Sequence, residues 1–331
     1  MQPIRVCLVG AGWTACNHFA GYAAIPEKAQ VVACVARTEW SKERARQWTP
    51  TPKIFDSFED ALADGGFDAV DLCVPHHLHA PMILASLRAG KHVLVETPTC
   101  ITLDECRQLR LAVREHPHLK AATAHVVRVW RTYQQAKRLV SEGVIGEVFH
   151  AFGDYAHKPD PAEYPSRDRW AYSLVYTGRL SISYHTVDLL RWMVGDVEEV
   201  YGDYNDDVKV AVLRFKNGAL GEVMTSGSVV RPYTLAMTLH GRKGTIQCFF
   251  HENVLKGYLH TSAEWKPMEL ATQPLHGRGT PEWKDEMENF VDAIREDKSP
   301  VCPLTDGIAT VETCLAIDAA MTMGTRVRVR Q

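Results

Sequence analysis

The chain has 331 residues, a length that predicts two domains, and its composition is that of an ordinary globular protein with 46% hydrophobic and 23% charged residues. The formal net charge is −3 and both signs are mixed along the chain, which argues against a nucleic-acid-binding surface or a polybasic membrane patch. The nine cysteines are scattered without a C-x-x-C pair, and neither a signal-peptide pattern nor a long apolar run is visible. We therefore expect a cytoplasmic protein.

Short apolar runs alternate with helical stretches over the first ~120 residues. Strands are predicted at residues 4–10, 31–36, 69–74 and 92–96, with helices at about 11–24, 41–48 and 79–90. Near-continuous apolar strands joined by helices are typical of a parallel sheet that is covered on both faces. This pattern predicts a Rossmann domain over residues 1–122.

The pattern changes after about residue 122. A helix at 133–143 is followed by strand-like runs at 146–155, 208–215, 220–229 and 233–241, and Asn217-Gly218 is a hairpin signal between two of them. The last helices are expected at 286–297 and 309–324, with Thr305-Asp306 as a cap region. Residues 123–331 are thus predicted to form an α+β domain with a large, open, mostly antiparallel sheet, unless the last helices pack against the first domain.

A G-x-G-x-x-A motif lies directly after the first predicted strand and opens a helix. The first glycine permits a tight turn, the second lets the backbone approach a pyrophosphate, and the alanine permits close helix–strand packing. The helix N-terminus faces the anion. In this strand–turn–helix context we expect dinucleotide binding at Gly10, Gly12, Trp13, Thr14 and Ala15.

The end of the second strand bears on the choice between NAD and NADP. It reads Ala36-Arg37-Thr38, without the acid that holds the ribose 2′-hydroxyl of NAD in many sites. Arg37 is suited to stack on the adenine and contact a 2′-phosphate, although the alternative is a solvated loop residue. Glu39 is close enough in sequence to reach a ribose. We expect NADP or NAD, with a preference for NADP.

Three longer segments resemble the Gfo/Idh/MocA family, the relatives of glucose–fructose oxidoreductase and inositol dehydrogenase. "VPHHLHAPMILASLRAGKHVLVETP" is similar to that family's "T-P-N-x-x-H … A-L-x-A-G-K-H-V-x-x-E-K-P", and "YQQAKRLVSEGVIGEV" and "HTVDLLRWMVG" are similar to two further family patterns. The resemblance implies a Rossmann domain plus an open-sheet domain, and assembly into a homodimer or homotetramer through that sheet. It also implies NAD(P)-dependent oxidation or reduction of a sugar, amino sugar or cyclitol at a carbinol carbon.

Carried over by position, the resemblance implies several site residues. His185 matches the catalytic histidine, and Asp188 matches an acid that follows it. Two positions depart from the pattern, because Thr97 stands at the place of the motif lysine and Ser181 at the place of an acid. The remaining matches, which imply contacts with the ribose and nicotinamide side of the cofactor, are Pro75, His76, His79, Glu96 and Pro98.

Hydride transfer from an alcohol needs a base for the hydroxyl proton and groups that hold the substrate. Histidine exchanges protons near neutral pH, so His185 is the expected general base, and a packed core histidine is the alternative. Thr97 has one uncharged hydroxyl, which suits it to orient a substrate oxygen but not to stabilise a developing alkoxide electrostatically.

Further substrate contacts are predicted around the aromatic, proline-broken stretch 154–172. Tyr155, His157 and Tyr184 are candidates there and next to His185, and the alternative for the stretch is a solvent-exposed excursion or an oligomer arm. Arg128 is either a substrate contact or a salt bridge that fixes the domain junction. His76, His77 and His79 have metal-binding side chains, but no fourth ligand is apparent, so no metal site is expected.

Two other functions remain open from the sequence. One is a redox-neutral glycosidase or isomerase with a tightly held cofactor, as the resemblance allows. The other is a cofactor-binding regulatory protein without catalysis. The departures at Thr97 and Ser181 favour these alternatives, whereas His185 with Asp188 favours an oxidoreductase.

Overall fold

The computed structural model describes residues 2–156, 158, 182–230, 233–249, 254–259 and 281–330. The chain forms two compact units. Unit 1 is Met1–Val129 with His276–Ile308, and unit 2 is Trp130–Leu275 with Ala309–Gln331. The segment 281–308 therefore belongs to the first unit.

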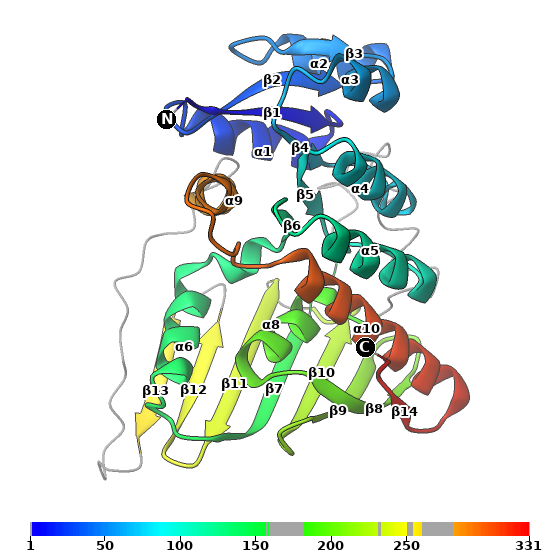
Figure 1. Cartoon of the computed structure of the whole chain (residues 1–331). Coiled ribbons are helices and arrows are strands. Elements are labelled where there is room, and N and C mark those ends of the chain that lie inside the picture. Colours follow the sequence, from blue (N-terminus) through cyan, green and yellow to red (C-terminus); the bar gives the residue numbers. More distant parts are fainter. Residues whose placement is uncertain are drawn as a thin grey trace. The chain divides into compact units, whose positions relative to one another are not determined.

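Unit 1 contains a six-stranded, wholly parallel sheet in the order β3-β2-β1-β4-β5-β6 (Figure 1). This order confirms the predicted Rossmann arrangement, in which the chain reverses direction across the sheet between β1 and β4. Two of its strands, β3 and β6, were not predicted from the sequence. The strands are β1 (Ile4–Val9), β2 (Ala29–Val35), β3 (Lys53–Phe55), β4 (Ala69–Leu72), β5 (His92–Glu96) and β6 (Ala121–Ala124).

The helices of unit 1 connect these strands and cover the sheet. Two of them start at side chains that accept a hydrogen bond from the first turn, Ser57 for α3 and Thr102 for α5. The α2 helix starts at Glu39, two residues before the prediction, because Thr38 and Ser41 form a capping box. The helices are α1 (Trp13–Ala23), α2 (Glu39–Arg46), α3 (Phe58–Asp64), α4 (His79–Arg88), α5 (Leu103–Glu115) and α9 (Pro281–Arg295).

The α9 helix packs beside α1 although nearly 260 residues of chain separate them (Figure 1). Its residues Met287, Phe290 and Val291 are at most 1% exposed and join the hydrophobic core that includes Leu8 of β1 and Ala15 of α1. Burial of this apolar surface explains why a helix so late in the chain belongs to unit 1.

Unit 2 contains an eight-stranded sheet in the order β13-β12-β11-β7-β10-β9-β8-β14. All neighbours are antiparallel except β7 and β10, so the sheet is mostly antiparallel, as predicted. The Asn217-Gly218 turn joins β9 to β10, and Gly218 has a φ of +88°. The strands are β7 (Val148–Ala156), β8 (Val197–Tyr204), β9 (Lys209–Phe215), β10 (Leu220–Ser226), β11 (Thr234–Gly241), β12 (Gly244–Phe249), β13 (Val254–Leu259) and β14 (Val327–Arg328).

Three helices lie over one face of this sheet: α6 (Arg131–Ser141), α8 (Tyr184–Val194) and the long α10 (Leu304–Met323), whose first turn belongs to unit 1 (Figure 1). The α10 helix begins before Thr305-Asp306, so these residues lie in its first turn and do not precede it as predicted. Gly153 brings α8 close to β7, because a Cβ at this position would lie 2.2 Å from the Thr186 side chain.

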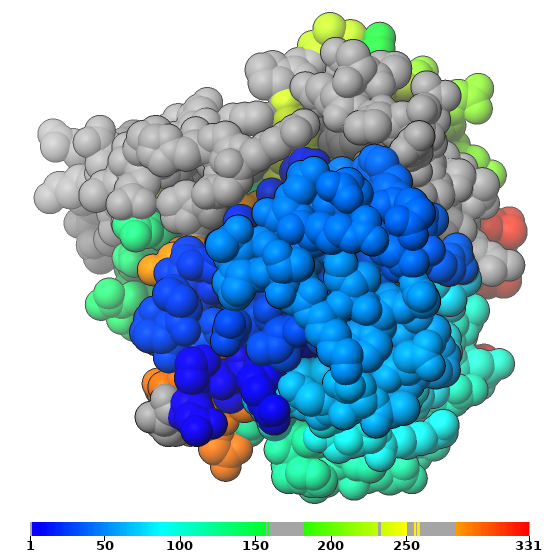
Figure 2. All heavy atoms as spheres, turned by 90° about the horizontal axis from the view of Figure 1, so that it is seen from above, coloured from blue at the N-terminus to red at the C-terminus, as the bar shows by residue number. Residues whose placement is uncertain are grey.

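In the space-filling view, residues from the first third of the chain form one continuous surface of unit 1 (Figure 2). Among the described residues, no helix combines the length and apolar character needed to cross a membrane.

Candidate active site

The glycine-rich turn after β1 lies at the carboxyl edge of the parallel sheet. Gly10 has a φ of +110°, and a Cβ there would lie 2.3 Å from the Cys73 carbonyl oxygen, so only glycine fits. Gly12 is the N-cap of α1, and a Cβ on it would meet nothing within 4 Å. The first turn of α1 receives no side-chain cap and contains no acidic residue. A helix N-terminus without a side-chain cap or an acid, next to a glycine with free space around it, fits the pyrophosphate of a dinucleotide.

Around this loop, the other motif residues take different positions. Ala15 is fully buried against the sheet, which is the packing role expected of it. Trp13 is 45% exposed at the first position of α1, and its ring meets the Trp283 ring edge-on at 6.1 Å between centroids. Thr14 is half-buried beside it.

The end of β2 presents Arg37 to solvent, whereas Ala36 is buried. Thr38 has a structural task, because its Oγ1 accepts a hydrogen bond from the Ser41 amide at 3.2 Å and caps α2. Glu39 pairs with Lys42 at 3.2 Å. Arg37 therefore projects outward next to an acid that already has a cationic partner.

The loop after β4 carries the predicted Pro75, His76 and His79, and the first two are half-buried. His79 is fully buried, and its ring nitrogens lie 2.8 Å from the carbonyl oxygens of Pro98 and Val74. It thus ties together the loops that follow β4 and β5. Burial lowers the pKa of His76 to about 4, so this histidine is neutral at physiological pH.

The loop after β5 places Glu96, Thr97 and Pro98 in half-buried positions. The Thr97 amide donates a hydrogen bond to Glu96 Oε2 at 2.9 Å, which holds the carboxylate against its own backbone. The Thr97–Pro98 peptide bond is cis.

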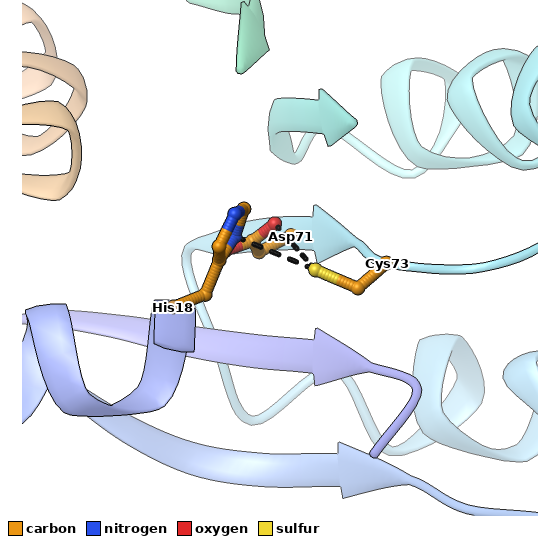
Figure 3. A group of neighbouring side chains, drawn as sticks. All are labelled: His18, Asp71 and Cys73. Carbon is orange, nitrogen blue, oxygen red and sulfur yellow. Dashed lines mark hydrogen bonds and ion pairs between the residues drawn. The ribbon is translucent and has the colours of Figure 1, made fainter. Parts of the chain in front are cut away.

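A buried ion-pair cluster lies behind this loop and was not predicted from the sequence. His18 of α1 is fully buried, with Nδ1 at 2.8 Å from Asp71 Oδ2 of β4 and Nε2 at 3.1 Å from Glu96 Oε1 of β5. Cys73 Sγ lies 3.4 Å from the same Nδ1, and Figure 3 shows the three side chains of His18, Asp71 and Cys73 converging from α1 and from the end of β4. Nitrogen, oxygen and sulfur atoms this close can bind a metal. Here, however, both ring nitrogens already face carboxylates.

These contacts set the charges of the cluster. Burial alone would lower the pKa of His18, but the adjacent Asp71 carboxylate raises it well above its ordinary value. Burial alone would likewise raise the pKa of Glu96, but the hydrogen bond from His18 lowers it. Burial raises the pKa of the Cys73 thiol and of the Glu286 carboxyl group of α9, which favours the protonated form of each. His18 is thus an imidazolium between two carboxylates.

One signal in the sequence points to this cluster. Asp71 stands inside the apolar run "AVDLCV", and an acid in a fully buried strand requires a buried partner. His18 lies three residues after Ala15 on α1, so the two residues share the face of the helix that packs on the sheet. The sequence does not identify His18 as the partner of Asp71, because this pairing depends on how α1, β4 and β5 pack together.

Arg128 has the arrangement expected of the salt-bridge alternative. Its side chain is 1% exposed, and Nη1 lies 2.9 Å from Asp306 Oδ2 and 3.1 Å from the Val301 carbonyl oxygen. The guanidinium therefore fastens the short helical turn at Val126–Arg128 to the beginning of α10 within unit 1.

In unit 2, His185 occupies the first turn of α8 and is half-buried. Its ring centroid lies 6.5 Å from that of Tyr155 on β7 and 6.3 Å from that of Tyr184. Asp188 is fully buried and accepts a hydrogen bond from Thr310 at 2.8 Å, so its carboxylate holds α8 to α10. The candidates His157 and Ser181 lie outside the described residues.

Comparison with known proteins agrees with this geometry. Residues 4–125 match the family model described as "Oxidoreductase family, NAD-binding Rossmann fold", and residues 133–247 match the model of the GFO/IDH/MocA C-terminal domain. The chain belongs to the GFO/IDH/MocA oxidoreductase family. The resemblance seen in the sequence is thereby confirmed.

Two curated members of this GFO/IDH/MocA family and one solved structure illustrate the similarity. Levoglucosan dehydrogenase of Pseudarthrobacter phenanthrenivorans is 27% identical over 290 residues, which cover 74% of this chain and 73% of the relative. Myo-inositol 2-dehydrogenase of Thermotoga maritima is 29% identical over 216 residues, 61% of each chain. A structure of levoglucosan dehydrogenase in complex with NADH has a TM-score of 0.88 with 22% identity and full coverage of both chains, which shows the shared fold.

Proposed function

We propose that the protein is an NAD(P)-dependent oxidoreductase that transfers hydride between a nicotinamide and a carbinol or keto carbon of a sugar, amino sugar or cyclitol. The observation that carries this proposal is the turn at Gly10 and Gly12, which leaves the N-terminus of α1 open at the carboxyl edge of a Rossmann sheet. Family membership and relatives that act on levoglucosan and myo-inositol support the substrate class.

The bound nicotinamide supplies the hydride acceptor or donor, and the chain supplies the proton chemistry and the substrate pose. His185 acts as the general base that takes the hydroxyl proton. Thr97 orients the reacting oxygen through its hydroxyl group. Tyr155 and Tyr184, which flank the His185 ring, are proposed substrate contacts.

Absorbance at 340 nm with a panel of sugars, amino sugars and cyclitols tests the function. A net change with substrate and NAD(P) supports the oxidoreductase. Product formation without net change in absorbance identifies the redox-neutral alternative, and cofactor binding without any product identifies the non-catalytic one.

We further propose that NADP binds at least as well as NAD, because the exposed Arg37 stands at the tip of β2 and Glu39 is paired with Lys42. Arg37→Ala should weaken NADP binding by about 10- to 150-fold and leave NAD binding nearly unchanged, since one charge-assisted hydrogen bond contributes roughly 1.5–3 kcal/mol. Fluorescence titration with both cofactors measures this. Equal losses for both, or a strong NAD preference in the wild type, contradict the proposal.

The sheet of unit 2 is proposed as a homodimer or homotetramer interface. On β9, Val210 and Val212 are 44% and 46% exposed, whereas Ala211 and Leu213, which alternate with them, are buried. Leu220 on β10 is 40% exposed. Apolar side chains gathered on one face of a sheet mark an association surface. Val212→Lys should convert the assembly to smaller species in sedimentation velocity, and an unchanged sedimentation coefficient would exclude this face.

The nine cysteines are free thiols and most of them are buried. Together with a nicotinamide cofactor, this supports a reducing compartment, and we propose the cytoplasm.

A further inference from the structure

The His18 ring lies between two acidic side chains, 2.8 Å from Asp71 and 3.1 Å from Glu96, so with the ring protonated the formal charges of the cluster sum to one negative unit. His18 and Asp71 have fully buried side chains, and Glu96 is the exposed end of the cluster with a side chain that is 19% accessible. The charge is therefore embedded in protein on one side and reaches solvent at the loop after β5. A charge placed this way is only weakly screened.

The position of Glu96 relates this charge to one half of the cofactor site. A Rossmann sheet binds one mononucleotide on each side of the point where the strand order reverses, and the end of β2 serves the adenosine half. In this chain the reversal lies between β1 and β4, so the nicotinamide half belongs to the carboxyl ends of β4 and β5. Asp71 lies within β4 and Glu96 is the last residue of β5.

The two redox states of the cofactor differ in charge at that half. The oxidised nicotinamide ring carries one positive charge and the reduced ring carries none, so a nearby fixed charge acts on the difference between their affinities. On the strength of the proposed function, we propose that the His18–Asp71–Glu96 cluster raises the affinity of the protein for the oxidised nicotinamide cofactor relative to the reduced one. The hydrogen bond from His18 lowers the pKa of Glu96, so the ring favours the ionised form of the carboxylate that reaches solvent.

The test compares dissociation constants for NAD⁺ and NADH, and for NADP⁺ and NADPH, by calorimetry or fluorescence titration. Glu96→Gln removes the negative unit and should weaken the oxidised form relative to the reduced form on the order of tenfold, whereas Glu96→Asp keeps the charge and should keep the ratio. Asp71→Asn removes one negative charge from the buried end of the cluster. This second variant tests the proposal if Glu96→Gln does not fold.

Asp68→Asn is the matched control. It also removes one carboxylate from unit 1, but Asp68 precedes β4 at the opposite edge of the sheet and pairs with the exposed Arg5 at 2.7 Å. This variant should leave the ratio of affinities unchanged.

The outcomes separate this inference from the proposed function. If the wild type binds neither redox state, the proposed function falls and the inference falls with it. If the wild type binds both and Glu96→Gln or Asp71→Asn leaves their ratio unchanged, only the inference is overturned. A stoichiometric metal ion in the purified protein, measured by mass spectrometry and lost in Asp71→Asn, would also overturn it, because the three side chains would then be metal ligands and not a fixed ion-pair cluster.

Discussion

Replacing His185 by alanine should lower kcat by about 10²–10⁴-fold and leave cofactor affinity nearly unchanged, because a positioned general base contributes that much to proton transfer. The half-buried ring lies in the first turn of α8, which is held to β7 by the close approach at Gly153 and to α10 by the Asp188–Thr310 hydrogen bond. Alanine is compatible with the helix, so the expected loss is chemical. Steady-state kinetics at 340 nm and cofactor titration together measure this separation.

Thr97→Ala is the companion variant. It removes one neutral hydrogen bond to the substrate, worth ~0.5–1.5 kcal/mol, and should cost roughly twofold to tenfold in kcat/KM. The Glu96 carboxylate keeps its bond to the backbone amide of residue 97 in this variant, so the loop should persist. If Thr97→Ala abolished turnover while His185→Ala remained near wild type, the two roles would be reversed and His185 would be a packing residue.

Gly12→Val should fold normally and weaken NAD(P) binding by about 100-fold or more, because a branched side chain occupies the approach to the first turn of α1 where the pyrophosphate is expected. The protein itself tolerates the change, since a Cβ on Gly12 meets no atom within 4 Å. Circular dichroism and thermal unfolding establish folding, and fluorescence titration measures affinity. Full affinity in this variant would remove the cofactor assignment.

Gly10→Ala provides the contrast within the same motif. At a φ of +110° an alanine is strained by about 1–3 kcal/mol, and its Cβ would in addition collide with the Cys73 carbonyl group. The expected result is a lower free energy of unfolding. Equal stability of the Gly10 and Gly12 variants would contradict the assignment of a structural role to Gly10 and a cofactor-binding role to Gly12.

Much of the fold was readable from the sequence, because strand and helix periodicity depend on local residue order. The strands β1, β2, β4 and β5, the helices α1 and α4, and the Asn217-Gly218 turn all follow from short patterns. The three-residue strand β3 was missed because "KIF" is too short for an alternation to show. The glycines of the G-x-G-x-x-A motif were likewise predictable, since their spacing and their place between a strand and a helix are enough to identify the motif.

The candidate site was less predictable where its geometry depends on contacts between distant segments of the chain. The His79 bonds to two backbone carbonyls, the pairing of Arg128 with Asp306 and the His18 cluster each join segments from different elements. His79 and Arg128 themselves were singled out from the sequence as candidate site residues. The groups that they bind could not be predicted, because a local sequence pattern does not tell which distant carbonyl or carboxylate contacts a given side chain.

The place of α9 has a consequence for biosynthesis. The core of unit 1 is completed by Met287, Phe290 and Val291 of α9. Residues 1–129 therefore leave the ribosome before the helix that covers part of their apolar surface has been synthesised. At about 5–20 residues per second, the intervening segment takes on the order of ten to thirty seconds to synthesise. During that interval the nascent first unit presents the α1 side of its sheet to chaperones and to neighbouring chains.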